Sequence, residues 1–330
     1  MSSTPKTINM IQAINLALDH AMEQDATVLA LGEDIADKQG GGVFKCTAGL
    51  SAKYGTERVK STPIAEQAIM GAAVGAALGG MRPVAEIMLM NFMTVGMDQL
   101  VNHAAKLRFM TGGQTHVPLT VRTATGAGFG TGGQHADYLE SWFAHTAGMK
   151  VVAPSTPADA YGLMLSCIFD DDPCLFIENL PLYFVPGAPP VPGTRVPIGK
   201  AKVVREGRDV TVISYSRTML EVNAVADELA KRDISVEVID LRSISPLDMD
   251  TLRASVAKTR RAVVAHEAQV DFGVGAEIAA RLQQDLFGQL LAPVGRVGAA
   301  RSPVPFSKAL EAAYLPTAER ISAAILQTLA

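Results

Sequence analysis

The stretch STPIAEQAIMGAAVGAALGGMRPVAE, residues 61–86, decides how the rest of the chain is interpreted. It places a carboxylate, Glu66, where a loop becomes a helix, and that helix carries no charge from residue 68 to residue 80. Gly71, Gly75 and Gly79 recur every four residues and therefore share one helical face. Each glycine costs a helix about 1 kcal/mol relative to alanine, so this face predicts a second helix packed very close.

The same apolar run has a rival interpretation as a membrane span. A bilayer needs about 20 consecutive apolar residues, and this run is shorter. We therefore expect a buried helix of a globular protein and no membrane association. The net charge of −4 also gives no basic surface for nucleic acid, so we expect no nucleic-acid partner.

Length and composition indicate an ordinary intracellular globular protein. The 330 residues suffice for two domains, and 48% hydrophobic with 19% charged residues excludes a disordered chain. The three cysteines form no C-x-x-C pair, so neither a disulfide framework nor a zinc site is supported. No basic region followed by an apolar stretch opens the chain, and we expect a cytoplasmic location.

Strand and helix patterns alternate along the first half of the chain. We expect strands at residues 28–31, 84–90, 118–123, 150–153 and 174–178, and helices at residues 7–24, 66–80 and 95–110, with another capped by Thr156. Residues 40–60 are expected to form a loop. Such alternation predicts a parallel sheet covered by helices on both faces.

Six prolines between residues 181 and 197 indicate an interdomain linker. Beyond them the alternation resumes, with one helix expected to be capped by Ser245 and to carry Pro246 in its first turn. The fold class is therefore α/β, with two domains that each contain a mainly parallel sheet flanked by helices. We place the domains at residues 1–183 and 199–330, joined by a linker at residues 184–198.

Few residues stand out as chemical groups on their own. The loop Gly128-Phe129-Gly130-Thr131-Gly132-Gly133 formally matches a dinucleotide fingerprint, but the next strand ends without the acid that holds the ribose. His135 closes this loop, where glycines let a ligand approach; a structural role is the alternative. The helix dipole alone also explains Glu66 in the first turn of a helix. A solvated loop explains the acidic residues Glu33 and Asp34, which follow the strand at residues 28–31.

Taken together, these residues resemble the beta subunits of the thiamine-diphosphate-dependent, decarboxylating component of 2-oxo acid dehydrogenase complexes, which include pyruvate, branched-chain 2-oxo acid and acetoin dehydrogenases. The similarity covers nearly the whole chain. The segments that carry it are Gly32-Glu33-Asp34, TPIAE at 62–66, RPVAE at 82–86, Asp98-Gln99, Gln134-His135, Phe143-Ala144-His145, Lys150-Val151-Val152, PIGKA at 197–201 and EVIDLR at 237–242. The resemblance implies a transketolase-like pyrimidine-binding domain followed by a transketolase C-terminal domain.

The resemblance also implies roles for single residues. Glu66 would hydrogen-bond the pyrimidine N1′ of the cofactor and favour its imino tautomer, which is acid–base work. Phe92, Ile64 and Met88 would line the flat, apolar faces of the pyrimidine ring. His135 would assist decarboxylation and acyl transfer to a lipoyl group.

Family members further hold a structural potassium ion, largely through backbone carbonyls. The matching positions are Leu119, Cys167, Ile168, Asp170 and Asp172. Oxygen ligands suit such a hard cation. A solvated acidic turn at residues 170–172 is the alternative interpretation.

One family motif is missing from the chain. Thiamine-diphosphate enzymes anchor the diphosphate and its magnesium ion through a Gly-Asp-Gly run, and none occurs in this sequence. The resemblance therefore implies an alpha subunit that supplies this half of the site, in an α2β2 heterotetramer that transfers its product to a lipoyl-bearing dihydrolipoyl acyltransferase.

Ala136 and Asp137 replace the serine, and often glutamine, that usually follow the active-site histidine in this family. This change leaves open which 2-oxo acid, or acetoin, is the substrate. Two alternative functions remain: an acyloin-forming or ketol-transferring subunit that uses no lipoamide, and a non-catalytic scaffolding subunit.

Overall fold

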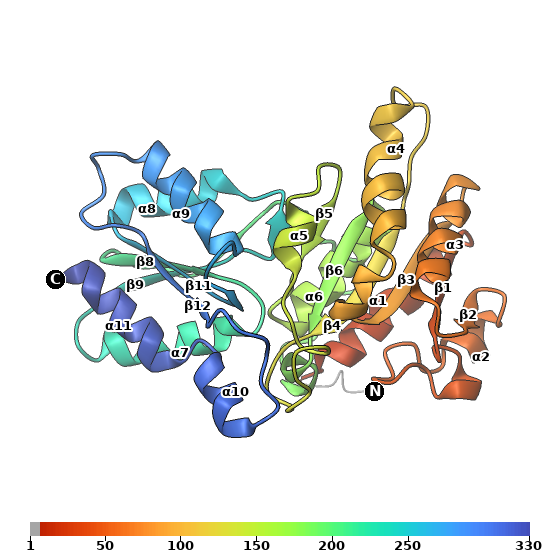
Figure 1. The fold of residues 1–330 in the computed structure, drawn as a ribbon, viewed down its shortest axis with the longest axis horizontal. Coiled ribbons are helices and arrows are strands. Elements are labelled where there is room, and N and C mark those ends of the chain that lie inside the picture. The colour runs from red at the N-terminus through yellow and green to blue at the C-terminus, as the bar shows by residue number, and fades with distance from the viewer. Residues whose placement is uncertain (1–6) are drawn as a thin grey trace. The chain divides into compact units, whose positions relative to one another are not determined.

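The computed structural model of the chain describes residues 7–330, so residues 1–6 of the expected first domain lie outside it. The chain forms two compact units (Figure 1). Unit 1 contains the residues up to Thr125 together with Trp142–Ile198, and unit 2 contains Gly126–Ser141 together with Gly199–Ala330. The glycine-rich loop thus packs in unit 2, although it lies in the first half of the sequence.

A sheet of parallel strands forms the centre of unit 1, with the order β5-β6-β4-β3-β1-β2. The strands are β1 (Val28–Glu33), β2 (Val59–Thr62), β3 (Arg82–Leu89), β4 (Thr120–Thr125), β5 (Lys150–Val152) and β6 (Cys174–Asn179). Every residue of β1, β4 and β6 is buried, as expected for parallel strands covered on both faces.

Two helices of unit 1, α1 (Met10–Gln24) and α6 (Pro157–Ile168), begin at residues whose side chains cap them. Unit 1 also contains α2 (Leu50–Tyr54), α3 (Glu66–Leu78) and α4 (Ala105–Met110), while α5 (Glu140–Ala144) continues from unit 2 into unit 1. Asn9 and Gln12 form a capping box at α1. The expected cap of α6 is confirmed, because the Thr156 side chain accepts a hydrogen bond from the Asp159 amide. Helices α1 and α6 pack against each other over the sheet.

Helix α3 has one buried side and one bare side. Ile69, Met70 and Val74 face the core of unit 1, whereas Gly71 and Gly75 are exposed on the opposite side. A Cβ atom added at Gly75 would meet no other atom within 4 Å. The π-helical segment Gln99–Ala104 contacts this face at Gly71, where an added Cβ would lie 3.7 Å from the Gln99 Cγ, whereas no helix among residues 7–330 covers Gly75. Among residues 7–330, no helix is long and apolar enough to cross a membrane.

The helix expected over residues 95–110 is confirmed as one continuous helical stretch over residues 97–110, but its first half contains a π-helical segment. A 3₁₀ helix at Met90–Thr94 precedes this stretch, and the π-helical segment at Gln99–Ala104 leads into α4. Gly96 lies between the 3₁₀ helix and the stretch, and a Cβ there would stand 2.6 Å from the Met70 Cγ. This close approach to α3 leaves no room for a side chain at position 96. The loop expected at residues 40–60 contains α2 and the start of β2.

Unit 2 is built around a second sheet with the order β12-β11-β8-β9-β7, in which only the β7–β9 pair among the described strands is antiparallel. Its strands are β7 (Lys202–Arg205), β8 (Val210–Ser214), β9 (Val236–Asp240), β11 (Ala262–Gln269) and β12 (Gly295–Ala299), and β10 (Ser243–Ser245) is a further short strand. Figure 1 shows α8 (Met249–Thr259) and α9 (Val274–Asp285) on one face and α7 (Thr218–Ala230) and α11 (Ala318–Leu329) on the other. The expected α/β class with a mainly parallel sheet in each half is confirmed.

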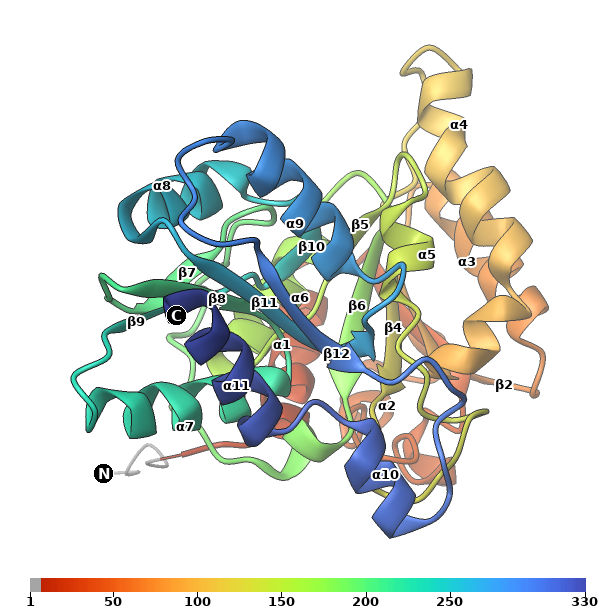
Figure 2. The same ribbon diagram turned by 60° about the vertical axis from the view of Figure 1, so that its left-hand side comes forward.

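Two features of unit 2 differ from the sequence expectation. Ser245 ends the strand β10 and caps no helix; Asp248 caps α8 instead, where its side chain accepts a hydrogen bond from the Thr251 amide. The expectation failed because two candidate caps lie three residues apart, and the strand uses the first of them. A further short helix, α10 (Lys308–Tyr314), follows β12, as Figure 2 shows.

Candidate functional site

Three carboxylates gather near the carboxyl ends of the strands of unit 1. Glu33 is the last residue of β1, Glu66 is the first residue of α3, and Glu86 lies in β3. Glu33 is only 8% exposed, which corrects the solvated loop expected there. Burial raises its pKa, and the carboxylates of Glu66, Asp34 and Glu86 raise it further. Ligands of parallel α/β sheets bind at this end of the strands.

The residues predicted to line the pyrimidine lie around the same region of unit 1. Met88 is near the end of β3 and Phe92 is in the following 3₁₀ helix; both are half-buried against the core of unit 1. Ile64 lies in the loop just before α3 and is 83% exposed. Glu66 itself is half-buried. A carboxylate and accessible apolar side chains are the groups that a polar-edged, flat ring requires.

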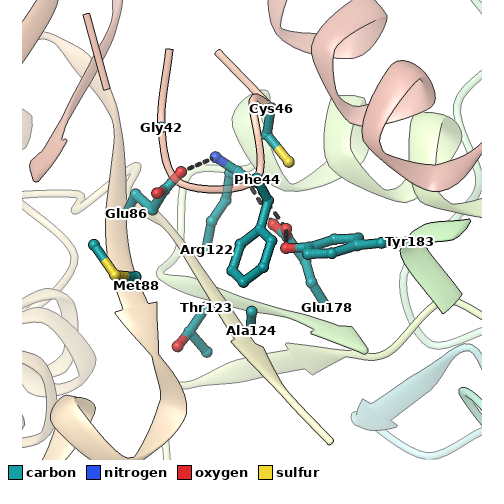
Figure 3. A pocket seen from close by; sticks show the side chains of 10 residues that line it. All are labelled: Gly42, Phe44, Cys46, Glu86, Met88, Arg122, Thr123, Ala124, Glu178 and Tyr183. Carbon is teal, nitrogen blue, oxygen red and sulfur yellow. Dashed lines mark hydrogen bonds and ion pairs between the residues drawn. The ribbon is translucent and has the colours of Figure 1, made fainter. Parts of the chain in front are cut away.

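A buried ion network lies next to these residues (Figure 3). Arg122 in β4 donates from Nε to the Glu178 Oε1 at 2.7 Å and from Nη2 to the Glu178 Oε2 at 2.9 Å. Its Nη1 donates to the Glu86 Oε2 at 2.5 Å. The Tyr183 hydroxyl donates a hydrogen bond to Glu178 as well. One guanidinium group thus connects the neighbouring strands β3, β4 and β6.

The protonation of this network follows from its burial and its charges. Burial opposes the charge of Arg122, but the carboxylates of Glu178 and Glu86 outweigh it and hold the arginine pKa well above its usual value. Burial raises the pKa of Glu178 despite the arginine. The Tyr183 pKa also lies well above its usual value because of burial and the adjacent Glu178 charge. The tyrosine therefore remains a hydrogen-bond donor at neutral pH.

A small cavity opens between the members of the network. Figure 3 shows Phe44, Met88 and Glu86 around it, together with the network itself. Its free space is about that of one water molecule, which is far too small for an aromatic ring. The cavity therefore cannot hold a cofactor. The network instead fixes Glu86, one of the three carboxylates Glu33, Glu66 and Glu86.

The loop that carries His135 has a backbone that needs glycine. Gly128, Gly130 and Gly132 have φ angles of 126°, 66° and 73°. A Cβ at Gly132 would lie 2.4 Å from the ring of Phe306. His135 is half-buried, and its amide donates to the Gly132 carbonyl at 3.1 Å. The two predicted catalytic residues therefore fall in different units, Glu66 in unit 1 and His135 in unit 2.

Ala136 has a structural reason to be apolar. It is 3% exposed and belongs to an apolar cluster of unit 2, where the hydroxyl of the usual serine would need a partner. Asp137 is half-buried. Burial raises the pKa of Tyr314, and the Asp137 charge raises it further.

The predicted potassium positions surround an acidic turn that is rich in ion pairs. The Arg82 guanidinium donates to the carbonyls of Ile168 and Asp170 at 3.3 and 2.9 Å. The Lys150 ammonium lies 2.6 Å from the Asp170 carboxylate, and Arg108 lies 2.6 Å from that of Asp172.

Two further carbonyls of the predicted set also accept backbone hydrogen bonds. The Leu119 carbonyl accepts one from Cys174, and the Cys167 carbonyl accepts one from Asp170. Because a carbonyl oxygen has two lone pairs, such an oxygen can still face a cation. Among residues 7–330, no group of three or more His, Cys, Asp and Glu side chains is arranged to hold a metal ion.

The sequence interpretation missed the buried network. Arg122 and Glu178 stand inside otherwise uncharged stretches, PLTVRTAT and CLFIEN, and a charge in a fully buried strand needs a partner. That pattern was the available signal. The pattern does not identify the ion-pair partner of either residue, because the pairing depends on the strand register.

Two domain families match the chain. The transketolase pyrimidine-binding domain matches residues 6–185, and the transketolase C-terminal domain matches residues 199–321. The chain also resembles the solved structure of a split-gene transketolase in an inactive beta4 tetramer, with a TM-score of 0.80 over 98% of both chains. The sequence identity is 22%, so this likeness shows the fold alone.

Curated relatives are more similar in sequence. The beta subunit of an acetoin:2,6-dichlorophenolindophenol oxidoreductase from Cupriavidus necator is 43% identical over 96% of both chains. The 3-methyl-2-oxobutanoate dehydrogenase subunit beta of Mycobacterium tuberculosis is 44% identical over 97% of this chain and 92% of its own length. The pyruvate dehydrogenase E1 component subunit beta of Staphylococcus epidermidis is 44% identical over 95% of this chain and 96% of its own length.

The buried network predicts a large stability loss when its arginine is removed. Arg122→Met leaves two buried carboxylates without their cation, and we expect the free energy of unfolding to fall by about 3–5 kcal/mol in urea titrations. Arg253→Met is the matched control, because Arg253 pairs with Asp250 on the surface and should cost about 1 kcal/mol or less. Equal, small losses in both variants would contradict the assigned role.

Proposed function

Because the chain belongs to the family of the beta subunits of acetoin, pyruvate and branched-chain 2-oxo acid dehydrogenases, we propose that it is the beta subunit of a thiamine-diphosphate-dependent dehydrogenase for a 2-oxo acid or acetoin. The observation that carries the proposal is the identity of 43–44% to such subunits over 95% or more of the chain. Glu66 at the start of α3, with apolar side chains in the same region, supports it.

In this function Glu66 would hold a proton at the pyrimidine N1′. Bound thiamine diphosphate supplies a carbon nucleophile for the substrate carbonyl once its aminopyrimidine is in the imino form. A half-buried carboxylate at a helix start, close to the buried Glu33, is suited to share a proton with a ring nitrogen. Phe92, Met88 and Ile64 would contact the ring faces and keep water from them.

His135 would act on the substrate side of the reaction. An imidazole on a loop of glycines can approach a ligand closely and donate a hydrogen bond to a developing negative charge. We propose that it assists decarboxylation and the transfer of the acyl unit to a lipoyl group. Ala136, the residue that follows His135, is buried in an apolar cluster. Substrate choice would therefore depend on the neighbouring Asp137 and on the partner subunit.

The chain would supply one half of the cofactor site. It contains no Gly-Asp-Gly run for a diphosphate and its magnesium ion. We propose that an alpha subunit holds both, in an α2β2 heterotetramer, and that a dihydrolipoyl acyltransferase accepts the acyl group. The beta-subunit names of the relatives support the alpha partner.

A potassium ion at the acidic turn is part of the same proposal. The carbonyls of Leu119, Cys167, Ile168 and Asp170 would contribute their remaining lone pairs. The carboxylates of Asp170 and Asp172 are already paired with Lys150 and Arg108. The carbonyl dipoles, more than these side-chain charges, would therefore hold the ion.

The bare face of α3 would be a subunit seam. Gly71, Ala72, Gly75 and Gly79 are exposed, and no contact within the described chain requires a glycine at position 75. A helix from another subunit could approach this face to backbone distance. Such an approach would offset the propensity cost of the glycines in α3.

Gly75→Leu tests the seam. We expect the isolated chain to be as stable as the wild type or more stable, since leucine is a better helix former by roughly 0.8 kcal/mol. Copurification with a coexpressed alpha subunit should be lost. Ala254→Leu, at an exposed position of α8, is the matched control and should assemble normally. Normal assembly of Gly75→Leu would exclude this face as the seam.

Glu66→Gln tests the proposed chemistry in the assembled enzyme. Glutamine keeps the shape of the side chain but cannot share the proton, so turnover should fall by about 100-fold or more while assembly is unchanged. The direct readout is the exchange rate of the cofactor C2 proton, followed by NMR. Asp34→Asn, at an exposed neighbouring carboxylate, should exchange normally. An undiminished exchange rate in Glu66→Gln would refute the role.

A further inference from the structure

The middle of the His135 loop is held by one buried carboxylate from a distant part of the chain. Glu311, in α10, is 3% exposed. Its Oε1 accepts a hydrogen bond from the Gly128 amide at 2.6 Å, and the Gly130 amide donates to Oε1 and Oε2 at 3.2 and 3.1 Å. Hydrogen bonds from neutral amides to an ionised carboxylate are about twice as strong as neutral ones.

Glycines make this contact necessary. Gly128, Gly130 and Gly132 have no side chains with which to fix the course of the loop, and glycine loses more conformational freedom on folding than any other residue. An external acceptor must therefore define the backbone. The Glu311 carboxylate binds the amides of Gly128 and Gly130, whose positive φ angles of 126° and 66° favour glycine.

Other residues of unit 2 hold the two ends of the loop. The Ala127 amide donates to the Glu267 Oε1 at 2.7 Å, and the Arg217 Nη1 donates to the Ala127 carbonyl at 3.0 Å. Past His135, the Tyr138 hydroxyl lies 2.7 Å from the Ser216 Oγ. The ends are thus fixed independently of Glu311, which acts on the segment between them.

Glu140, at the end of this segment, is tied to Tyr215 by its own side chain. The Tyr215 hydroxyl donates to its Oε1 at 2.5 Å, and burial raises the Glu140 pKa to about 7.

We propose that Glu311 is a positioning residue for His135. It holds the amides of Gly128 and Gly130, and the Gly132 carbonyl then accepts the His135 amide, so the histidine backbone follows directly from the held segment. The catalytic consequence rests on the proposed function of His135. The mechanical part, a loop ordered by one carboxylate, stands without it.

Hydrogen exchange measured by mass spectrometry tests the mechanical part in the full chain copurified with its alpha subunit. In the wild type, the amides of Gly128 and Gly130 should exchange slowly. Glu311→Gln keeps the side-chain volume but loses the charge and one acceptor, so their exchange should rise about tenfold or more. Fast exchange in the wild type, or unchanged exchange in the variant, overturns the proposal.

Steady-state kinetics tests the catalytic part in the same preparations. We expect Glu311→Gln to lower kcat at least tenfold while KM and the affinity for thiamine diphosphate change less than twofold, because the loop moves and unit 1 does not. Acetate added to Glu311→Ala should restore part of kcat. A loosened loop with unchanged kcat would overturn the positioning role.

Glu237→Gln is the matched control. Glu237 is a buried carboxylate of the same unit that accepts from the Gly207 amide at 3.1 Å and pairs with Lys258, away from the loop contacts. It should change neither loop exchange nor kcat. A wild-type enzyme inactive on every 2-oxo acid and on acetoin would refute the proposed function, and the exchange experiment alone would then decide for or against the loop.

Discussion

The contact of the Arg122 guanidinium with Glu86 and Glu178 is the constraint on which the site of unit 1 depends. The three residues lie on adjacent strands, and Glu86 and Arg122 are direct partners in the register of β3 and β4. The arginine binds the Glu86 carboxylate. The charge of Glu86, like that of Glu66, raises the pKa of Glu33. A buried cation thus offsets part of the negative charge that would otherwise accumulate beneath the proposed proton-sharing carboxylate.

The site that this network supports is open in the isolated chain. Ile64 is 83% exposed, the cavity of the network has space for about one water molecule, and no element among residues 7–330 packs against Gly75 on the glycine face of α3. These features are consistent with the proposal that another subunit completes the site. Unit 2 contributes differently, since its buried carboxylates order the loop that carries His135.

Local signals in the sequence predicted what local physics decides. The parallel strands, the cap at Thr156 and the shared side of the α3 glycines were predicted correctly, because each depends on residues a few positions apart. The helix expected close against that side stays a prediction. The Arg122 pairing and the Glu311 contact could not be predicted, since they join residues 36, 56 and 183 positions apart through the register and the topology. The roles of Glu66 and His135 came from family resemblance, because a lone carboxylate or imidazole has no pattern of its own.

We propose above all that this chain carries only half of a thiamine-diphosphate site. Isothermal titration of thiamine diphosphate with magnesium into the isolated chain, and into the chain copurified with its alpha subunit, tests it most directly. We expect weak or undetectable binding to the isolated chain and stoichiometric, tight binding to the heteromer. Tight, stoichiometric binding by the isolated chain would contradict the account.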